Sequence, residues 1–274
     1  MSPLILDRYS PSASPTRKAR SQSFAVSGAK YEDIRRLVDI EFHAFEEEKT
    51  NQILSYRDHN QPSHFQRAVR SYQSAMGRND GSRRRTKPNT SRRPSQRPGQ
   101  ETVRFRKIID SDSGLIISWA KTETKTYTEQ ELATPADIGH EGEAQMNRDW
   151  FALNEKLRRV YMGTRPHCYI GMLATQPCYQ HHGAGTMLLE SILADADEAG
   201  IECYLEATDT AKPLYERHGF VEINELRFNP LDYSVYGFKV ERQTIMVRGA
   251  MSSGQRQEVR SWEDAMQGAV QAQL

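Results

Sequence analysis

One stretch of the chain constrains the fold more than any other. PHCYIGMLAT (166–175) has the apolar and aromatic content of a buried strand, and AGTMLLESILADADEA (184–199) carries apolar residues at helical spacing. The loop between them holds Gly183 and Gly185, and Gly200 follows the helix, where a left-handed cap is expected. A glycine-rich turn that opens a helix presents backbone amides at the positive end of the helix dipole. The sequence therefore predicts an anion-binding site at this turn.

Regular elements continue downstream of this stretch, whereas the upstream part is less periodic. Downstream, we expect a strand at 201–208, a short helix at 210–220 that ends on Gly219, and two strands at 220–228 and 239–249. Upstream, we expect a strand at 24–29, helices at 31–49 and 64–76, a hairpin from 101–110 and 114–124, a long excursion at 125–150 and a short helix at 153–163.

Positive charge is concentrated in one segment. Residues 78–100 contain seven Arg, one Lys and one Asp, a formal charge of +7, so the rest of the chain carries −6 of the total +1. The segment is rich in Pro and Ser and has no apolar period, which is the composition of a disordered insertion. A solvated loop, a nuclear import signal and a polyanion contact all remain open for it. Without interleaved aromatic residues it does not favour stacking on single-stranded nucleic acid, and nucleic acid is not an expected partner.

Length and composition indicate one packed domain with polar ends. At 274 residues and 37% hydrophobic content the chain can bury a core, although its mean hydropathy of −0.76 is low. We expect a disordered tail at 1–22, a domain at 23–250 interrupted by the basic insertion, and a C-terminal tail at 251–274 that could form a frayed helix. No apolar run is long enough to cross a membrane.

Cysteine usage and the N-terminus indicate the compartment. Cys168, Cys178 and Cys203 are an odd number without paired spacing, which favours reduced thiols inside a cell. The first residues lack the apolar stretch of a secretory signal. We therefore expect a cytoplasmic protein, or a nuclear one if the basic insertion acts in import.

The glycine turn is compatible with several kinds of ligand. Cys178, His181 and His182 lie close together, but no second ligand cluster accompanies them, so no metal is expected. A nucleotide-binding phosphate loop would need a Lys after its last glycine, and none follows. A dinucleotide fingerprint fits Gly183-x-Gly185, with Glu206 about 20 residues on for a ribose, but Pro177 separates the strand from the turn. A Rossmann-type dinucleotide-binding protein remains an alternative.

A further pattern fits the spacing throughout. L-A-T-x-P-x-Y-Q-x-x-G-x-G-T, from Leu173 to Thr186, resembles the acyl-CoA signature of the GNAT N-acetyltransferase family. A-x-x-L-Y-x-x-x-G-F, residues 211–220, is similar to the closing helix and strand of that family, and residues 163–175 resemble a fungal-type branch of it. The resemblance implies an α/β (α+β) fold with a mixed, mostly antiparallel, splayed sheet flanked by helices. It also implies acetyl-CoA as co-substrate and an amine as acceptor.

The resemblance assigns residues to the coenzyme. The strand before the loop would take the pantetheine arm through its backbone, and the loop amides would take the pyrophosphate. These positions are Leu173, Ala174 and Thr175 on the strand and Gln180, His181, His182, Gly183, Ala184, Gly185 and Thr186 in the loop. The chain departs from the family where His181 and His182 replace the usual Gly and basic residue, and where Thr208 replaces a frequent Asn.

Acetyl transfer from a thioester to an amine needs a base, a donor to the oxyanion and a proton for the thiolate. By resemblance Tyr215 is the general acid, and a backbone N–H near Leu173 or Ala174 is the oxyanion donor. Glu206 and His167 are the candidate bases. The resemblance implies N-acetylation of a primary amine by direct attack in a ternary complex. A non-catalytic, regulatory acyl-CoA-binding module on the same fold remains the alternative.

Overall fold

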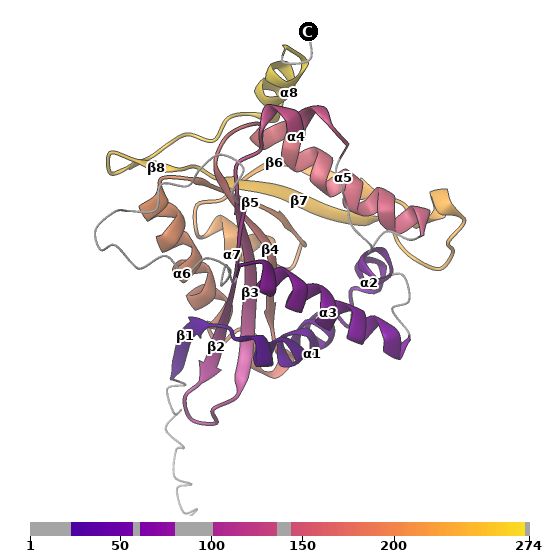
Figure 1. Ribbon diagram of the computed structural model, residues 1–274, viewed down its shortest axis with the longest axis vertical. Helices are drawn as coiled ribbons and strands as arrows, with labels where there is room; N and C mark the ends of the chain where they lie inside the picture. Colours follow the sequence, from indigo (N-terminus) through magenta and orange to yellow (C-terminus); the bar gives the residue numbers. More distant parts are fainter. Residues whose placement is uncertain (1–22, 57–60, 80–100, 136–143, 272–274) are drawn as a thin grey trace, which may run out of the picture.

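The computed structural model describes residues 23–56, 61–79, 101–135 and 144–271. Within these residues one seven-stranded sheet runs in the order β1-β2-β3-β4-β5-β7-β6 (Figure 1). Neighbouring strands are antiparallel except for β4 and β5, which are parallel. The strands are β1 (Phe24–Gly28), β2 (Thr102–Asp110), β3 (Ile116–Lys125), β4 (His167–Thr175), β5 (Glu202–Ala207), β6 (Val221–Phe228) and β7 (Glu241–Arg248), and β8 (Met251–Ser252) forms a separate hairpin with β9 (Gln255–Arg256).

Helices cover both faces of the sheet (Figure 1). One face carries α6 and the short α7, and the other carries α1, α3 and α5, with α2 against α5. The α-helices are α1 (Ile34–Ala44), α2 (Lys49–Ser55), α3 (Pro62–Asn79), α4 (Glu129–Ala133), α5 (Gln145–Met162), α6 (Ala184–Ala199), α7 (Lys212–Glu216) and α8 (Trp262–Gln271), and 3₁₀ turns lie at η1 (Tyr31–Asp33), η3 (Pro177–Tyr179) and η4 (Pro230–Tyr233).

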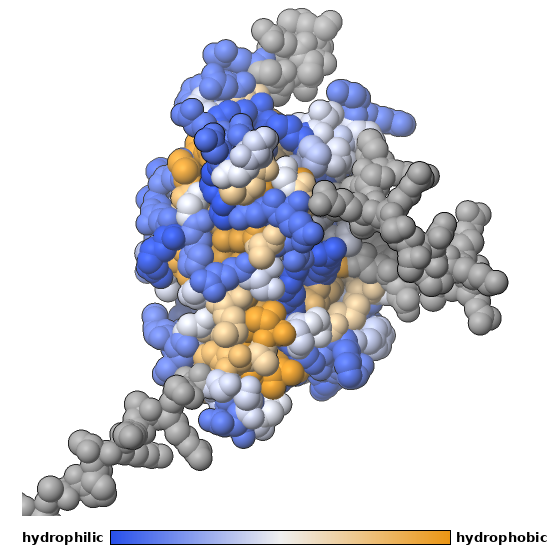
Figure 2. All heavy atoms as spheres, turned by 90° about the vertical axis from the view of Figure 1, so that its left-hand side faces the viewer, coloured by the Kyte–Doolittle hydropathy of each residue, from blue (hydrophilic) through white to orange (hydrophobic). Residues whose placement is uncertain are grey.

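The apolar stripe of α6 explains why this helix lies flat on the sheet. Leu188, Leu189 and Ile192 are fully or almost fully buried and pack against β3, β4 and β5. Gly200 ends the helix with φ 64°, the left-handed cap that the sequence predicts. The view onto the α6 side is largely hydrophilic in its upper part, and apolar residues gather lower down (Figure 2). The buried stripe fixes the position of the turn at the start of α6.

The central strands part where β4 leaves β5. Their ladder consists of three pairs, from His167↔Glu202 to Tyr169↔Tyr204, although both strands continue beyond it. On its other side, where β4 pairs with β3, Gly171 forms a β-bulge. Lys121 pairs with Met172 and Thr122 with Ile170, so Gly171 has no partner residue on β3. A Cβ on Gly171 would lie 3.0 Å from the Tyr169 ring, which favours glycine there. We call the unpaired stretch, Ile170–Thr175 against Leu205–Ala207, the β4–β5 opening.

The segment after β3 differs from the sequence prediction. The expected excursion at 125–150 and short helix at 153–163 are replaced by α4 and by the 18-residue α5. Thr128 and Glu131 form a capping box at the start of α4. Asn147 in the first turn of α5 is buried, and its Nδ2 donates to the carbonyl oxygens of Ile53 and Leu54, both at 2.7 Å. Because this buried residue is polar, the start of the helix lacks an apolar pattern in the sequence.

Two further predictions change in extent. The helix expected at 31–49 is divided into η1 and α1, with α2 beginning separately at Lys49. Part of the segment 251–274, expected to be a tail, packs on the body of the molecule, because Val259, Trp262 and Ala265 belong to the core next to α5. Trp262 of α8 stacks on Tyr161 of α5 with 5.9 Å between ring centroids, and the Tyr161 hydroxyl donates to the Arg260 carbonyl oxygen. The aromatic stack holds α8 against α5.

The tail at 1–22 and residues 80–100 of the basic insertion lie outside the described residues, and residues 78–79 end α3. No helix in the described part of the chain is both long and apolar enough to span a bilayer.

Candidate active site

The turn that follows β4 is held from several sides. The Gln180 side chain donates to the Thr175 carbonyl oxygen at 3.3 Å, and the Tyr179 hydroxyl donates to Asp110 at 3.2 Å. The backbone N–H of Gln176 donates to the Ile117 carbonyl oxygen at 2.8 Å. These bonds tie the loop to β2, β3 and the end of β4. The loop is therefore a fixed structure next to the β4–β5 opening.

Gly183 gives the loop its free amides. Its φ of 89° is a conformation that glycine adopts without strain, and a Cβ there would meet nothing within 4 Å. Gly183 is the N-cap of α6, and it offers no side chain to the first amides of the helix. Those amides at the positive end of the helix dipole suit a phosphate group. Gly183, Ala184, Gly185 and Thr186 thus lie at the start of one helix, and Gln180 lies three residues before Gly183 at the end of η3.

The strand residues assigned to the coenzyme border the opening. Leu173, Ala174 and Thr175 lie beyond the last β4–β5 pair, so this edge of β4 has no ladder partner among the described strands. On its other edge β4 is held to β3, where Ser118 Oγ lies 2.8 Å from the Ala174 carbonyl oxygen and 2.7 Å from Thr175 Oγ1. The free edge leaves backbone groups that can bind an extended ligand.

Glu206 lies on the opposite side of the opening, near the end of β5. Its side chain shares a face of the sheet with Tyr204 and looks toward α5, because Leu205 and Ala207 point into the α6 core. Burial raises the pKa of Glu206 to about 7, against the opposing effects of the Arg158 charge and of hydrogen bonding by Tyr169. A carboxylate that exchanges its proton near neutral pH suits a general base.

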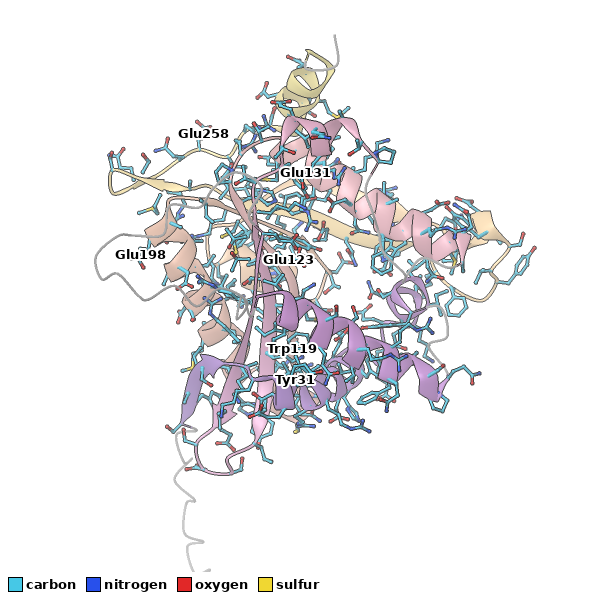
Figure 3. The ribbon with its side chains drawn as sticks, in the orientation of Figure 1. Tyr31, Trp119, Glu123, Glu131, Glu198 and Glu258 are labelled. Carbon is cyan, nitrogen blue, oxygen red and sulfur yellow. The ribbon has the colours of Figure 1, made fainter. Side chains whose placement is uncertain are left out.

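Arg158 of α5 organises the surroundings of Glu206. Its guanidinium lies 3.8 Å from the centroid of the Tyr169 ring, and its Nε donates to the Tyr127 hydroxyl at 2.9 Å. Glu123 of β3, labelled near the centre of the molecule in Figure 3, faces the same charges. Burial acts to raise the pKa of Glu123, but Lys121 at 2.7 Å and Arg158 hold it below its usual value. Sequence reasoning missed Arg158, Tyr169 and Glu123, since no motif marks them.

Tyr215 approaches from the α6 side. It lies on α7 in the same core as Leu188 and Ala207, is 6% exposed, and meets Phe220 edge-on at 5.6 Å. Burial raises the pKa of Tyr215 above its ordinary value, so the phenol stays protonated at neutral pH. Within the described residues its hydroxyl has no hydrogen-bond partner. Tyr215 and Glu206 therefore belong to opposite faces of the sheet, and the β4–β5 opening lies between those faces.

His167, the other candidate base, lies at the closed end of β4. It pairs with Glu202, and Glu206 lies four residues further along β5, about 13 Å away at strand rise. The imidazole is fully buried beside Tyr127, with Nδ1 3.0 Å from the Arg165 carbonyl oxygen. Burial lowers its pKa to about 4, which keeps the ring neutral. The structure does not bring His167 to the opening.

This splayed, mostly antiparallel sheet flanked by helices is the GNAT acyltransferase fold, which confirms the fold class that the resemblance implies. Residues 123–230 match the family model described as acetyltransferase (GNAT) domain. Over these residues, less than half of its length, the chain is similar to that family. In the comparison with curated proteins, none matches this chain.

Two solved structures illustrate the fold. A mosquito arylalkylamine N-acetyltransferase (like 5b) is 17% identical, with 82% of this chain and 99% of that chain covered and a TM-score of 0.54. The Drosophila melanogaster polyamine N-acetyltransferase is 12% identical, with 82% of this chain and 98% of that chain covered and a TM-score of 0.52. At these identities the likeness concerns the fold.

The Rossmann-type alternative is wrong. That fold needs a doubly wound parallel sheet with the glycine turn directly after a strand. Here β4 and β5 are parallel over three pairs, the other ladders of the sheet are antiparallel, and η3 lies between β4 and Gly183.

Proposed function

We propose that the protein transfers an acetyl group from acetyl-CoA to a primary amine by direct attack in a ternary complex. The observation that carries this proposal is the arrangement around the β4–β5 opening. An acid with a free hydroxyl, Tyr215, lies on one face, and a base that titrates near neutral pH, Glu206, lies on the other.

The residues next to the opening fit acetyl-CoA. The free edge of Leu173–Thr175 suits the amide groups of the pantetheine arm, and the uncapped start of α6 suits the pyrophosphate. The open space at Gly183 lets an anion approach the backbone. His181 and His182 are both exposed at this turn and would border the pyrophosphate. The co-substrate supplies the activated acyl group as a thioester.

The chain's own groups then supply the proton transfers. Glu206 takes a proton from the acceptor ammonium, so that the neutral amine attacks the thioester carbonyl carbon. A backbone N–H near Leu173 or Ala174 donates to the oxyanion of the tetrahedral intermediate. When the C–S bond breaks, Tyr215 donates its proton to the departing thiolate. The nitrogen, which gained a bond in the attack, releases its extra proton to solvent as the amide forms, and the tyrosinate takes up a proton from solvent, so that Tyr215 is restored. Direct attack needs no cysteine nucleophile, and Cys168 and Cys203 are buried.

A calorimetric titration with acetyl-CoA tests the coenzyme site. We expect binding by the wild type and its loss in Gly183→Glu, because the new carboxylate would lie beside the pyrophosphate. Gly254→Glu in the β8–β9 turn is the matched control, since Gly254 also has a positive φ and open space around it. NAD serves as the ligand control. Equal binding in the wild type and Gly183→Glu would refute the assignment of the turn.

The acceptor search follows, beginning with arylalkylamines and polyamines, the classes named for the two structural neighbours. Acetyl-CoA binding without turnover on any amine would favour a non-catalytic acyl-CoA-binding module on this fold. A cytoplasmic or nuclear location, and membership of a fungal-type branch, stay predictions that fractionation and an alignment of homologues would test.

A further inference from the structure

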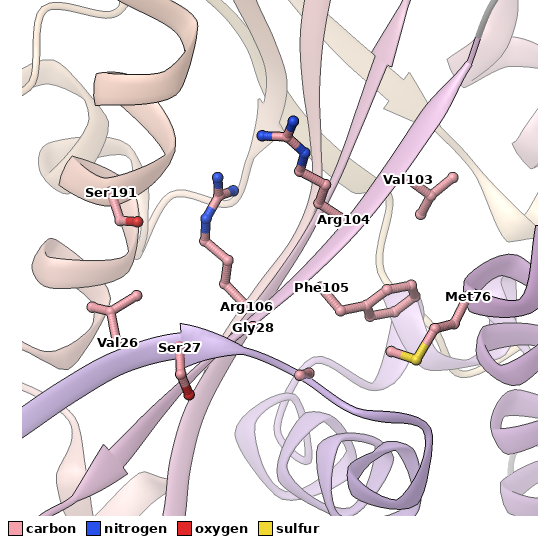
Figure 4. A pocket seen from close by; sticks show the side chains of 10 residues that line it. Val26, Ser27, Gly28, Met76, Val103, Arg104, Phe105, Arg106 and Ser191 are labelled. Atoms are coloured by element: carbon pink, nitrogen blue, oxygen red, sulfur yellow. The ribbon is translucent and has the colours of Figure 1, made fainter. Parts of the chain in front are cut away.

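A cavity lies away from the β4–β5 opening. It measures about 480 Å³ and lies where β1 ends beside β2, between α3 on one face of the sheet and α6 on the other (Figure 4). In the order of the sheet, β3 and β4 separate β2 from the opening. The cavity therefore cannot belong to the acetyl-transfer site described above, and its volume lies in the range of small-molecule sites.

One part of the cavity is cationic. Arg104 and Arg106 are alternate residues of β2, so they project from the same face, and both donate to the same oxygen, Oδ2 of Asp195 on α6. Each guanidinium has five N–H donors, and together the two carry one charge more than the single carboxylate neutralises. Arg106 is only 13% exposed, so its remaining donors are held away from water.

Two hydroxyl groups complete the cationic part. Ser27 of β1 and Ser191 of α6 line the cavity, and neither has a hydrogen-bond partner in the described part of the chain. Ser191 lies one turn before Asp195 on α6, so it presents its hydroxyl on the side that faces the arginines. Guanidinium pairs with hydroxyl donors are the groups that bind carboxylate and phosphate oxygens.

The other part of the cavity is apolar. Phe105, the residue between the two arginines, projects from the opposite face of β2 and points toward Met76 of α3 (Figure 4). Phe105 is 6% exposed and belongs to the core under α1 and α3, so this wall is rigid. The end of β1 at Gly28 separates the apolar wall from the arginines, and a ligand that spans both must be amphipathic.

We propose that this cavity binds a small amphipathic anion, with a carboxylate or phosphate head on Arg104 and Arg106 and an apolar group against Phe105 and Met76. The head group accepts hydrogen bonds from the guanidinium N–H groups that do not bond Asp195 and from the hydroxyl groups of Ser27 and Ser191. Its negative charge neutralises the one positive charge of the arginine pair that the Asp195 carboxylate does not balance. The site is independent of the acetyl-CoA turn and of the proposed transfer chemistry.

A calorimetric titration tests the proposal. It uses the full chain with Gly183→Glu, which blocks the coenzyme turn, in a buffer without phosphate. Phenylphosphate and phenylacetate are the probes, and their relative affinities show whether the head group is phosphate or carboxylate. We expect inorganic phosphate to bind about tenfold more weakly than phenylphosphate, because it leaves the apolar wall empty. We expect Arg106→Gln to weaken phenylphosphate by about tenfold or more.

The controls separate binding from folding. Arg227→Gln removes an exposed arginine that pairs with Glu225 at the far edge of the sheet, and it should leave binding unchanged. Ser191→Asp keeps both arginines and places a carboxylate in the cationic part, so it should also weaken binding, without removing an ion pair. Failure of both aromatic probes to bind, or equal binding in the wild type, Arg106→Gln and Ser191→Asp, overturns the proposal.

Discussion

Tyr215 offers the most direct test of the chemistry at the scale of a single residue. Replacing Tyr215 by Phe removes the hydroxyl and keeps the ring against Phe220. We expect kcat to fall by about 10²-fold or more, because the departing thiolate loses its proton donor, while the KM for acetyl-CoA stays the same. Steady-state kinetics measure both. Tyr31→Phe, which removes the hydroxyl of an exposed tyrosine, is the control. An unchanged kcat in Tyr215→Phe would exclude Tyr215 as the acid.

Glu206 is tested through the pH dependence of turnover. Its active form is the carboxylate, and its pKa is raised to about 7, so kcat/KM should rise with pH up to about pH 7 and then level off. Glu206→Gln should lower kcat/KM and remove this ascending limb. Glu123→Gln serves as comparison, because the pKa of Glu123 lies below its usual value and its loss should leave the limb in place. A limb that persists in Glu206→Gln would assign it to another group.

The candidate site was partly predictable residue by residue. The resemblance to the GNAT family assigns Gln180, Gly183 and Gly185, since its signature is a local motif with residues in fixed order. Arg158 and Tyr169 could not be predicted, because their contact joins α5 to β4 and depends on how the helix crosses the sheet. His167 was a reasonable candidate from its position at a strand start. Its distance from the opening follows only from the register of β4 and β5, in which His167 pairs with Glu202 at the closed end.

At the scale of elements, α5 shows how a buried polar residue hides a helix. Trp150 is 4% exposed and Tyr161 is fully buried, which is a helical core face. Asn147, at 1% exposed, interrupts the apolar period at the start of that face. A periodicity argument counts it as polar and solvent-facing, and so predicts an excursion. Its true role is to bind the carbonyl oxygens at the end of α2, a contact that sequence cannot show.

The same contact gives a prediction about stability. Asn147→Ala leaves two buried carbonyl groups without a donor, so it should cost about 1–3 kcal/mol of unfolding free energy. Chemical denaturation measures this loss. Asn154→Ala on the same helix is the matched control, because its Nδ2 donates to the Trp150 carbonyl oxygen one turn earlier and not to another element of the described chain. A cost no larger than that of the control would show that α2 is held to α5 by apolar contact alone.

For the whole molecule, the region from β4 to β7 was predictable and the packing around it was not. Strands and helices from 166 onward have strong local patterns, and the resemblance to the GNAT family implies the splayed sheet. The allocation of α1, α3 and α5 to one face depends on contacts distant in sequence, such as that of Tyr72 of α3 with Phe105 of β2. The C-terminal segment is the clearest case, because its weakly apolar, Gln-rich sequence predicts a tail.

Whether α8 stabilises the domain is decided by Trp262. The indole stacks on Tyr161, which is fully buried and whose hydroxyl is bonded to the Arg260 carbonyl oxygen. Trp262→Ala should therefore lower the free energy of unfolding by about 2 kcal/mol and the Tm by several degrees. The loss is smaller than for the removal of a fully buried Trp, because the Trp262 side chain is half-buried. Met266→Ala on the same helix removes an exposed side chain and should leave the Tm unchanged. Calorimetric unfolding separates the two cases. One cooperative transition at a lower Tm in Trp262→Ala means that α8 unfolds with the sheet, whereas an unchanged Tm means that the segment from 251 onward is a tail, as its sequence predicts.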